Sequence, residues 1–234
     1  MTVDHDSSSG FRHAVVTGAS SGIGRAIAER LLAAGWRVTG IDLAPSGFSH
    51  EGFRSLQADL AEPHALVAQL AGIGVVTALV HAAGYMRVGR LGELTHENGE
   101  GMWRVHVGAA EVLADALAPH MTEGGRIVLI GSRTATGAAG RSQYAATKAA
   151  LTGLARSWAI ELAPRLITVN VIAPAATDTP FLRDPGRAGT APVLPPMGRY
   201  VDPAEVAALT AFLLSPEAGA ITGQTITICA GASL

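Results

Sequence analysis

The sequence predicts an α/β fold in which helices cover both faces of a parallel sheet. Short segments rich in β-branched residues alternate with helical segments along most of the chain. A glycine-rich turn joins the first predicted strand to the first predicted helix, which is the context of nucleotide-binding α/β domains. At 234 residues, of which 48% are hydrophobic, the chain is long enough for one domain with a large core.

The composition limits which binding partners and which cellular compartment we expect. The net charge of −2 provides no electrostatic attraction for nucleic acid or an anionic membrane. The single cysteine, Cys229, excludes an intramolecular disulfide and is compatible with a reducing compartment, so we expect a cytoplasmic protein. Charged residues interrupt every long apolar run, and no cluster of metal ligands is recognisable. Residues 1–10 are polar and acidic, unlike a signal peptide, and predict a flexible tail before a single domain at 11–234.

The first strand, turn and helix predict a dinucleotide site. His13–Thr17 is a β-branched run, and helical periodicity begins after Gly24 and ends at Gly35. Between them lies Gly18-Ala-Ser-Ser-Gly22-Ile-Gly24, whose glycines allow a tight turn and a close approach of the backbone to a pyrophosphate. The helix N-terminus would present N–H groups to that anion. A glycine-rich turn without a ligand is the alternative.

The second predicted strand, 37–42, ends in an acid. Asp42 lies about 20 residues past the glycines, where a carboxylate accepts a hydrogen bond from a ribose 2′-hydroxyl and repels a 2′-phosphate. This position favours NAD over NADP. Neither Ser21 nor its neighbours supply a cation for a phosphate, and we expect Arg25 to face solvent or a partner subunit.

The next elements continue the alternation. Strands are predicted at 53–58 and 75–80, with a helix at 62–70 between them. Asp59 and Leu60 lie between the third strand and this helix; the pair could reach an adenine ring, or Asp59 could cap the helix. The second predicted strand of this pair runs directly into His81-Ala-Ala-Gly84.

The second half predicts three helices and three strands. The helices are expected at 98–120, 142–163 and 203–214, and the strands at 125–131, 166–172 and 224–229. The strand 125–131 delivers Ser132 to its carboxyl end, the edge at which open α/β sheets bind ligands. The segment 175–200 is rich in proline and glycine and is too long for a plain connection, so we expect a functional lid over the substrate.

Tyr144 and Lys148 form the candidate catalytic pair. At a spacing of four residues they lie one above the other on a helix. A nearby ammonium favours the phenolate, so we expect Lys148 to lower the pKa of Tyr144 toward the range of a useful acid/base catalyst. Ser132 could hydrogen-bond the oxygen whose charge changes in the reaction. An ordinary surface pair on a helix is the alternative.

Together these motifs resemble those of the short-chain dehydrogenase/reductase family over residues 12–234. Thr17–Gly24 resembles the cofactor loop of the family, and 81–84 resembles its motif at the centre of the sheet. Ser132, Tyr144 and Lys148 match the catalytic serine, tyrosine and lysine. Pro174 with Thr179 resembles the segment that closes over the nicotinamide, and 221–224 resembles the C-terminal signature.

The resemblance implies a single doubly wound Rossmann-type domain with a seven-stranded parallel sheet and hydride transfer between a nicotinamide and an alcohol or carbonyl carbon. Many members are tetramers that pair two long helices, here the predicted helices 98–120 and 142–163. The implied cofactor-binding residues are Gly18, Ser20, Ser21, Gly22, Ile23, Gly24, Asp42, Leu43, Asp59, Leu60, His81, Ala82, Ala83, Gly84, Tyr144, Lys148, Pro174, Thr177 and Thr179.

Three positions depart from the family pattern. His106 and His81 stand where asparagine is usual, and Ala175 replaces the glycine after Pro174. We hypothesise that His106 preserves the family's proton relay to the lysine, because a histidine both donates and accepts hydrogen bonds. The alternative is a histidine packed against the sheet. The extra methyl of Ala175 is tolerable if its backbone φ is negative.

The substrate is the least determined feature. The candidate pocket draws on Tyr85, Met86, Arg87, Arg133, Arg141 and the loop 177–200, and Arg133 could pair with a substrate carboxylate or face solvent. Short stretches resemble ring-diol dehydrogenases of the 2,3-dihydro-2,3-dihydroxybenzoate type, which suggests a cyclic diol, a polyol or a hydroxy acid as substrate. The alternatives are an NADPH-dependent 3-oxoacyl-type reductase and a non-catalytic NAD-binding regulator.

Overall fold

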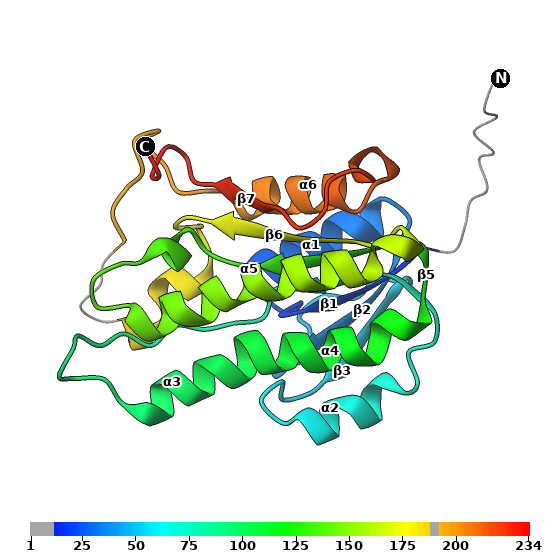
Figure 1. Cartoon of the computed structure of the whole chain (residues 1–234), viewed down its shortest axis with the longest axis horizontal. Coiled ribbons are helices and arrows are strands. Elements are labelled where there is room, and N and C mark those ends of the chain that lie inside the picture. The colour runs from blue at the N-terminus through cyan, green and yellow to red at the C-terminus, as the bar shows by residue number, and fades with distance from the viewer. Residues whose placement is uncertain (1–11, 188–191) are drawn as a thin grey trace.

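The computed structural model describes residues 12–187 and 192–234. Its sheet has seven strands in the order β3-β2-β1-β4-β5-β6-β7, and each pair of neighbours is parallel (Figure 1). The strands are β1 (His13–Thr17), β2 (Arg37–Asp42), β3 (Phe53–Gln57), β4 (Val76–His81), β5 (Met121–Ile130), β6 (Thr168–Pro174) and β7 (Thr225–Ile228). The predicted doubly wound fold with a seven-stranded parallel sheet is confirmed.

Helices cover both faces of the sheet. In Figure 1, α3, α4 and α5 lie in front of the sheet, and α1 and α6 lie behind it. The α-helices are α1 (Gly22–Ala33), α2 (Pro63–Leu70), α3 (His96–Trp103), α4 (Ala109–Leu117), α5 (Ser142–Leu162) and α6 (Pro203–Leu213).

The strand sequences explain this layering. Successive residues of a strand point to opposite faces, so a strand that is buried on both faces is apolar throughout. Val15 packs with α2, α4 and α5 in one core, whereas its neighbour Val16 packs with α1 and α6 in the other. Both side chains are fully buried. The near-continuous apolar runs of the central strands are therefore the direct signature of a two-core sheet.

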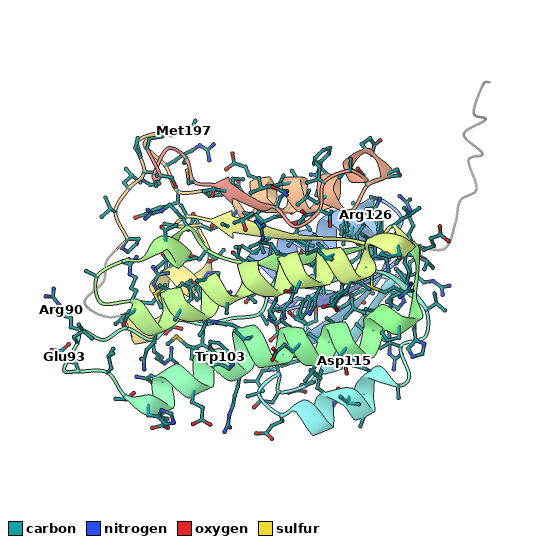
Figure 2. The ribbon with its side chains drawn as sticks, viewed as in Figure 1. Arg90, Glu93, Trp103, Asp115, Arg126 and Met197 are labelled. Atoms are coloured by element: carbon teal, nitrogen blue, oxygen red, sulfur yellow. The ribbon has the colours of Figure 1, made fainter. Side chains whose placement is uncertain are left out.

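The strand order indicates where a ligand would bind. The order reverses between β1 and β4, and ligands of open α/β sheets bind at the carboxyl ends of the strands at such a reversal. Thr17, His81 and Ile130 lie at or beside those ends. Arg126 lies within β5 and pairs with Thr168, the first residue of β6, and its guanidinium donates to the carbonyl oxygens of Gly125 and Leu166 (Figure 2).

The main difference between the structure and the sequence prediction lies in the long helix expected at 98–120. The structure divides this stretch into α3, a π-helical turn at Arg104–Gly108, α4 and a 3₁₀ turn at Ala118–His120. A π turn adds a residue to the helical repeat, and no spacing of apolar residues signals it. His106 lies inside this turn, so the helix is irregular beside the candidate site.

Several predicted strand and helix ends also shift. β5 begins at Met121 rather than at residue 125, and β6 begins at Thr168 rather than at residue 166. Leu166 takes a left-handed conformation, with φ of 56°, that a strand residue does not adopt. The C-terminal signature ties the last strand to its neighbour: the Asn170 amide donates to the carbonyl oxygen of Ile221 and accepts from the N–H of Gln224.

The predicted lid is partly described. It begins with 3₁₀ turns at Pro180–Arg183 and Pro185–Arg187, and the N–H of Met197 donates to the carbonyl oxygen of Ala230. The Met197 side chain is exposed near the C-terminus (Figure 2). The tail 1–10 and residues 188–191 of the lid lie outside the described residues.

Two further observations concern the described chain as a whole. None of its helices is both long and apolar enough to cross a bilayer. The outer surface of α3 and α4 exposes Trp103 and Asp115 (Figure 2). The predicted tetramer, which would pair this surface and α5 with other copies, stays a prediction.

Candidate functional site

A cavity of about 980 Å³ opens at the carboxyl ends of the central strands. It extends from the glycine turn and Asp42 to Tyr144 and the segment Pro192–Pro196. This volume lies at the upper end of ligand pockets, which suits a dinucleotide together with a small substrate. Most of the predicted cofactor-binding residues line it: Gly18, Ser21, Gly22, Ile23, Gly24, Asp42, Leu43, Asp59, Leu60, Ala82, Ala83, Gly84, Tyr144, Lys148, Pro174, Thr177 and Thr179.

The glycine turn has the shape that a dinucleotide requires. Gly18 and Gly22 have φ of 69° and 53°, the left-handed region that favours glycine. A Cβ on Gly24 would lie 2.3 Å from the carbonyl oxygen of Gly18, so only glycine lets α1 pack this closely on the turn. Ser21 makes no side-chain capping bond, so the first N–H groups of α1 are left without that acceptor beside the cavity. An anionic pyrophosphate fits this site.

Asp42 lies at the same end of the cavity. Its carboxylate accepts hydrogen bonds from the N–H of Ser20 at 2.9 Å and the N–H of Ala44 at 3.1 Å. Arg25 does not line the cavity; it pairs with Glu29 at 2.8 Å and packs over the Phe48 ring. The described lining of the cavity includes two acids, Asp42 and Asp59.

Ser132, Tyr144 and Lys148 converge at the other end. Ser132 follows β5, and its hydroxyl accepts from the N–H of Thr134 at 3.1 Å. Hydrogen bonding by this side chain acts to lower the pKa of Tyr144. Lys148, one turn along α5 from Tyr144, donates from Nζ to the carbonyl oxygen of Ile130 at 2.8 Å. All three residues are buried, at 9%, 5% and 5% exposed. The arrangement can hold a substrate oxygen against a phenol and a serine hydroxyl.

The pKa shifts of the pair differ from the expectation. Burial raises the pKa of Tyr144, while the Ser132 hydrogen bond and the charges of Arg187 and Arg141 act to lower it. The predicted lowering by Lys148 is wrong for this structure. Burial lowers the pKa of Lys148 itself to about 7, and its ammonium is directed at a backbone carbonyl rather than at the phenol.

His106 has both ring nitrogens engaged. The N–H of Tyr85 donates to Nε2 at 3.1 Å, so Nε2 carries no proton. Nδ1 must then carry the proton, and it donates at 2.8 Å to the Thr147 hydroxyl, which in turn donates to the carbonyl oxygen of Tyr144. Burial and the nearby Lys148 charge hold the pKa of His106 well below its usual value. This geometry favours the packed histidine over a proton relay.

His81 is held in the opposite tautomer. The Thr17 hydroxyl accepts from the N–H groups of Ala82 and Ala83, so its own proton goes to Nδ1 of His81 at 2.9 Å. Nε2 then donates to the carbonyl oxygen of Val105 at 3.1 Å, within the π turn that contains His106. The two departures from the family pattern are thus joined through one turn of backbone.

Three predicted site residues do not line the cavity. His81 and His106 are fully buried behind it, and Ser20 supports the site through its bonds to Asp42 and Ala44. Their side chains are committed to protein partners, which residue spacing cannot show. Asp59 lines the cavity and also accepts from the N–H of Ala61 at 2.9 Å, so it forms a turn ahead of α2 and does not cap the helix.

Sequence reasoning did not single out several lining residues. Arg187 and Arg104 line the cavity, and the C-terminal residues Gly231 and Leu234 close one side of it. Arg187 lies in the proline-rich segment 175–200, and no motif marks it. Ala175, in contrast, takes no positive φ, so the condition set for its methyl is met.

Comparison with known proteins identifies the class. A family model described as enoyl-(acyl carrier protein) reductase matches residues 18–233. The 3-oxoacyl-[acyl-carrier-protein] reductase FabG of Vibrio cholerae is 36% identical, over 93% of this chain and 96% of its own.

Solved structures agree with this result. A short-chain dehydrogenase from Burkholderia cenocepacia in complex with NADP is 37% identical with a TM-score of 0.84, covering 96% of this chain and 98% of its own. Thermoplasma acidophilum aldohexose dehydrogenase is 29% identical with a TM-score of 0.88, covering 95% of this chain and 94% of its own.

The fold, the glycine turn and these relatives define a nicotinamide-dependent oxidoreductase that acts on alcohol or carbonyl groups. The chain belongs to the short-chain dehydrogenase/reductase family.

Proposed function

We propose that this protein is an NAD-dependent oxidoreductase that transfers a hydride between the nicotinamide and a secondary alcohol or ketone, with Tyr144 as the acid/base. The observation that carries the proposal is a single cavity with Asp42 at one end and the Ser132, Tyr144 and Lys148 cluster at the other.

The residues of the glycine turn and α1 would hold the pyrophosphate, and Asp42 the adenosine ribose. The cofactor would lie against Ala82, Ala83 and Gly84. Its nicotinamide end would be covered by Pro174, Thr177 and Thr179. Thr179 packs against the glycine turn, since a Cβ on Gly22 would lie 3.3 Å from its Cβ. When bound, the nicotinamide supplies the hydride acceptor, or in its reduced form the donor.

Tyr144 and Ser132 carry the proton chemistry in this proposal. During oxidation the Tyr144 phenolate would accept the alcohol proton as the hydride leaves carbon. During reduction the Tyr144 phenol would donate a proton to the substrate oxygen and become the phenolate. The Ser132 hydroxyl donates to the substrate oxygen or to Tyr144, and stabilises the charge that develops. Burial lowers the pKa of Lys148 to about 7, so a nearby charge can change its protonation state close to neutral pH.

The choice of NAD rests on Asp42. A carboxylate beside the ribose accepts from a 2′-hydroxyl and repels a 2′-phosphate. Arg25 of α1 pairs with Glu29 and does not line the cavity. The related Burkholderia cenocepacia structure is in complex with NADP and therefore favours the other cofactor, so cofactor preference is measured first.

An NADPH-dependent 3-oxoacyl-type reductase is the second candidate. The observation in its favour is the similarity to 3-oxoacyl-[acyl-carrier-protein] reductases from several bacteria, at 35–37% identity. The ring-diol resemblance, the lid, the tetramer and the cytoplasmic location stay predictions.

The test is a turnover panel. The purified protein is given NAD⁺ or NADP⁺ with sugars, polyols, cyclic diols and hydroxy acids, and NADH or NADPH with an acetoacetyl thioester, and nicotinamide absorbance is followed. We expect oxidation with NAD⁺ that Tyr144→Phe reduces by at least about a thousandfold, since this change removes the proton-transferring group. Thioester reduction with NADPH and none of these oxidations would select the second candidate.

A further inference from the structure

Thr147 lies on α5 between Tyr144 and Lys148 and is only 2% exposed. Its hydroxyl donates to the carbonyl oxygen of Tyr144 at 2.8 Å and accepts the Nδ1 proton of His106, also at 2.8 Å. A threonine hydroxyl carries one proton and two lone pairs, so it can make both bonds at once. This hydroxyl therefore joins the backbone of the proposed acid/base to a second buried side chain.

The ring of His106 is held at its other nitrogen by a different part of the chain. Nε2 accepts from the N–H of Tyr85 at 3.1 Å, and a Cβ on Gly84 would lie 2.8 Å from this nitrogen, so the backbone packs directly on the ring. The π turn that contains His106 is itself bonded to His81, whose Nε2 donates to the carbonyl oxygen of Val105 at 3.1 Å. These contacts fix the ring independently of α5.

The ring of His106 also contacts the phenol ring of Tyr144. The two rings meet edge to face, with centroids 5.6 Å apart and planes at 88°. This is a favoured arrangement of aromatic rings. His106 therefore restrains Tyr144 twice: once through the ring contact, and once through the Thr147 hydroxyl that is bonded to the Tyr144 backbone. A displacement of this turn of α5 would disturb both contacts.

An ordinary bond back to the preceding turn is the alternative role for the Thr147 hydroxyl, because helix threonines commonly make one. Thr210 of α6 is an example in this chain: it is fully buried, and its hydroxyl donates to the carbonyl oxygen of Val206 at 2.9 Å. Thr147 differs because its hydroxyl also accepts from His106. Without it, the Nδ1 proton of a fully buried ring would lose its acceptor, which costs free energy unless the ring moves.

We propose that Thr147 and His106 act together as positioning residues that set where the Tyr144 phenol oxygen lies. Neither residue is among the described residues that line the cavity, so both act through Tyr144. Proton transfer needs the phenol oxygen within hydrogen-bond reach of the substrate oxygen, and a misplacement of about 1 Å can cost about a hundredfold in rate. This inference rests on the proposed function, in which Tyr144 is the acid/base.

Thr147→Val tests the inference, because it removes the hydroxyl at nearly constant volume, whereas Thr147→Ser keeps the hydroxyl. With NAD⁺ and the best substrate of the turnover panel, Thr147→Val should lower kcat at least about tenfold while both KM values stay within about twofold. Thr147→Ser should keep kcat within about threefold of the wild type. Thr210→Val loses only a bond within its own helix, so it should retain the wild-type kcat.

The double variant of His106→Asn and Thr147→Val tests whether the two residues act as one unit. Its kcat should be close to that of Thr147→Val alone, because residues that share one network have non-additive effects. Fully additive effects would overturn the inference. So would a kcat of Thr147→Val that matches Thr210→Val, or a loss confined to KM, which would show weaker binding rather than misplacement of the acid/base.

Crystal structures separate this inference from the proposed function, because they need no turnover. After superposition of the sheet, the Tyr144 oxygen of Thr147→Val should lie at least about 0.5 Å from its wild-type position, and that of Thr147→Ser and Thr210→Val should not move. Such a shift in a protein that oxidises no alcohol would support the positioning, and only the proposed function would fail. A phenol oxygen that keeps its place in Thr147→Val would overturn the inference.

Far-UV circular dichroism verifies that each variant is folded. Thr147→Ala removes the same hydroxyl, so it replaces Thr147→Val in both measurements should that variant not fold, with the same expected results.

Discussion

At the residue scale, Asp42 makes hydrogen bonds within the protein and is proposed to make one to the cofactor. Its carboxylate already binds the N–H groups of Ser20 and Ala44, and we propose that it also accepts from the cofactor ribose. Asp42→Ala should lower kcat/KM with NAD⁺ by about ten- to a hundredfold, the size of a lost charge-assisted hydrogen bond, and should raise kcat/KM with NADP⁺. Steady-state kinetics with both cofactors measures this change.

Asp42→Asn is the closer control, because its amide oxygen can still accept from one of the two N–H groups while the charge is gone. If the charge sets the preference, Asp42→Asn should gain activity with NADP⁺ as Asp42→Ala does. A wild-type protein that already prefers NADP⁺ would contradict the role given to Asp42.

His106 provides the second prediction at this scale. The ring stays neutral well below its usual pKa, because Tyr85 donates to it and Thr147 accepts from it in a buried site. His106→Asn should therefore leave the apparent pKa values of the pH–rate profile between pH 6 and 9 in place, and lower kcat by less than about tenfold through misplacement of α5. A limb of the profile that disappears in the variant would restore a proton role for His106.

At the element scale, α6 is stabilised by a complete capping box. The Asp202 side chain accepts from the N–H of Ala204 at 2.8 Å, and Glu205 reaches back to the N–H of Asp202 at 2.9 Å. Asp202→Ala should lower the free energy of unfolding by about 1 kcal/mol, seen as a lower urea midpoint at unchanged m-value. Asp202→Asn keeps the acceptor and should lose much less. Equal losses in both variants would show that charge near the helix terminus, rather than the cap, matters.

At the scale of the whole molecule, the buried histidines couple stability to pH. The pKa of His81 falls to about 3 in the folded protein, mainly through burial, and that of His106 also falls well below 6.5. Below pH 6.5 the unfolded chain binds protons that the folded protein excludes, so the free energy of unfolding falls as the pH is lowered. The loss is about 1.4 kcal/mol per pH unit for each histidine, and it is absent above about pH 7.

Urea unfolding at pH 7, 6 and 5 measures this slope. His81→Asn should reduce it by about 1.4 kcal/mol per pH unit, whereas His96→Asn, at an exposed position on α3, should not change it. Glu205, whose pKa is lowered to about 2, adds its own loss of stability only below about pH 4.5, outside this window. An unchanged slope in His81→Asn would show that His81 is protonated in the folded protein.

Sequence alone predicted the architecture and most of the residues that line the cavity. Apolar runs such as 75–80 predicted strands buried on both faces, and the glycine turn and Asp42, predicted to bind the cofactor, both line the cavity. These features are local in the chain, so residue type and spacing are enough to predict them. Ser132, Tyr144 and Lys148 could also be predicted, because strand end and helix spacing bring them to one edge.

The tertiary structure decided what depends on distant neighbours. The π turn around His106, the opposite tautomers of the two histidines and the raised pKa of Tyr144 depend on burial and on contacts between distant parts of the chain. The hydrogen-bond partners of the two histidines lie 21 to 64 residues away, which spacing does not encode. Arg187 lines the cavity with its guanidinium packed on the Phe181 ring and donating to the Phe181 carbonyl oxygen. Local geometry is set by the chain itself, whereas desolvation and charge at a site are set by everything that packs around it.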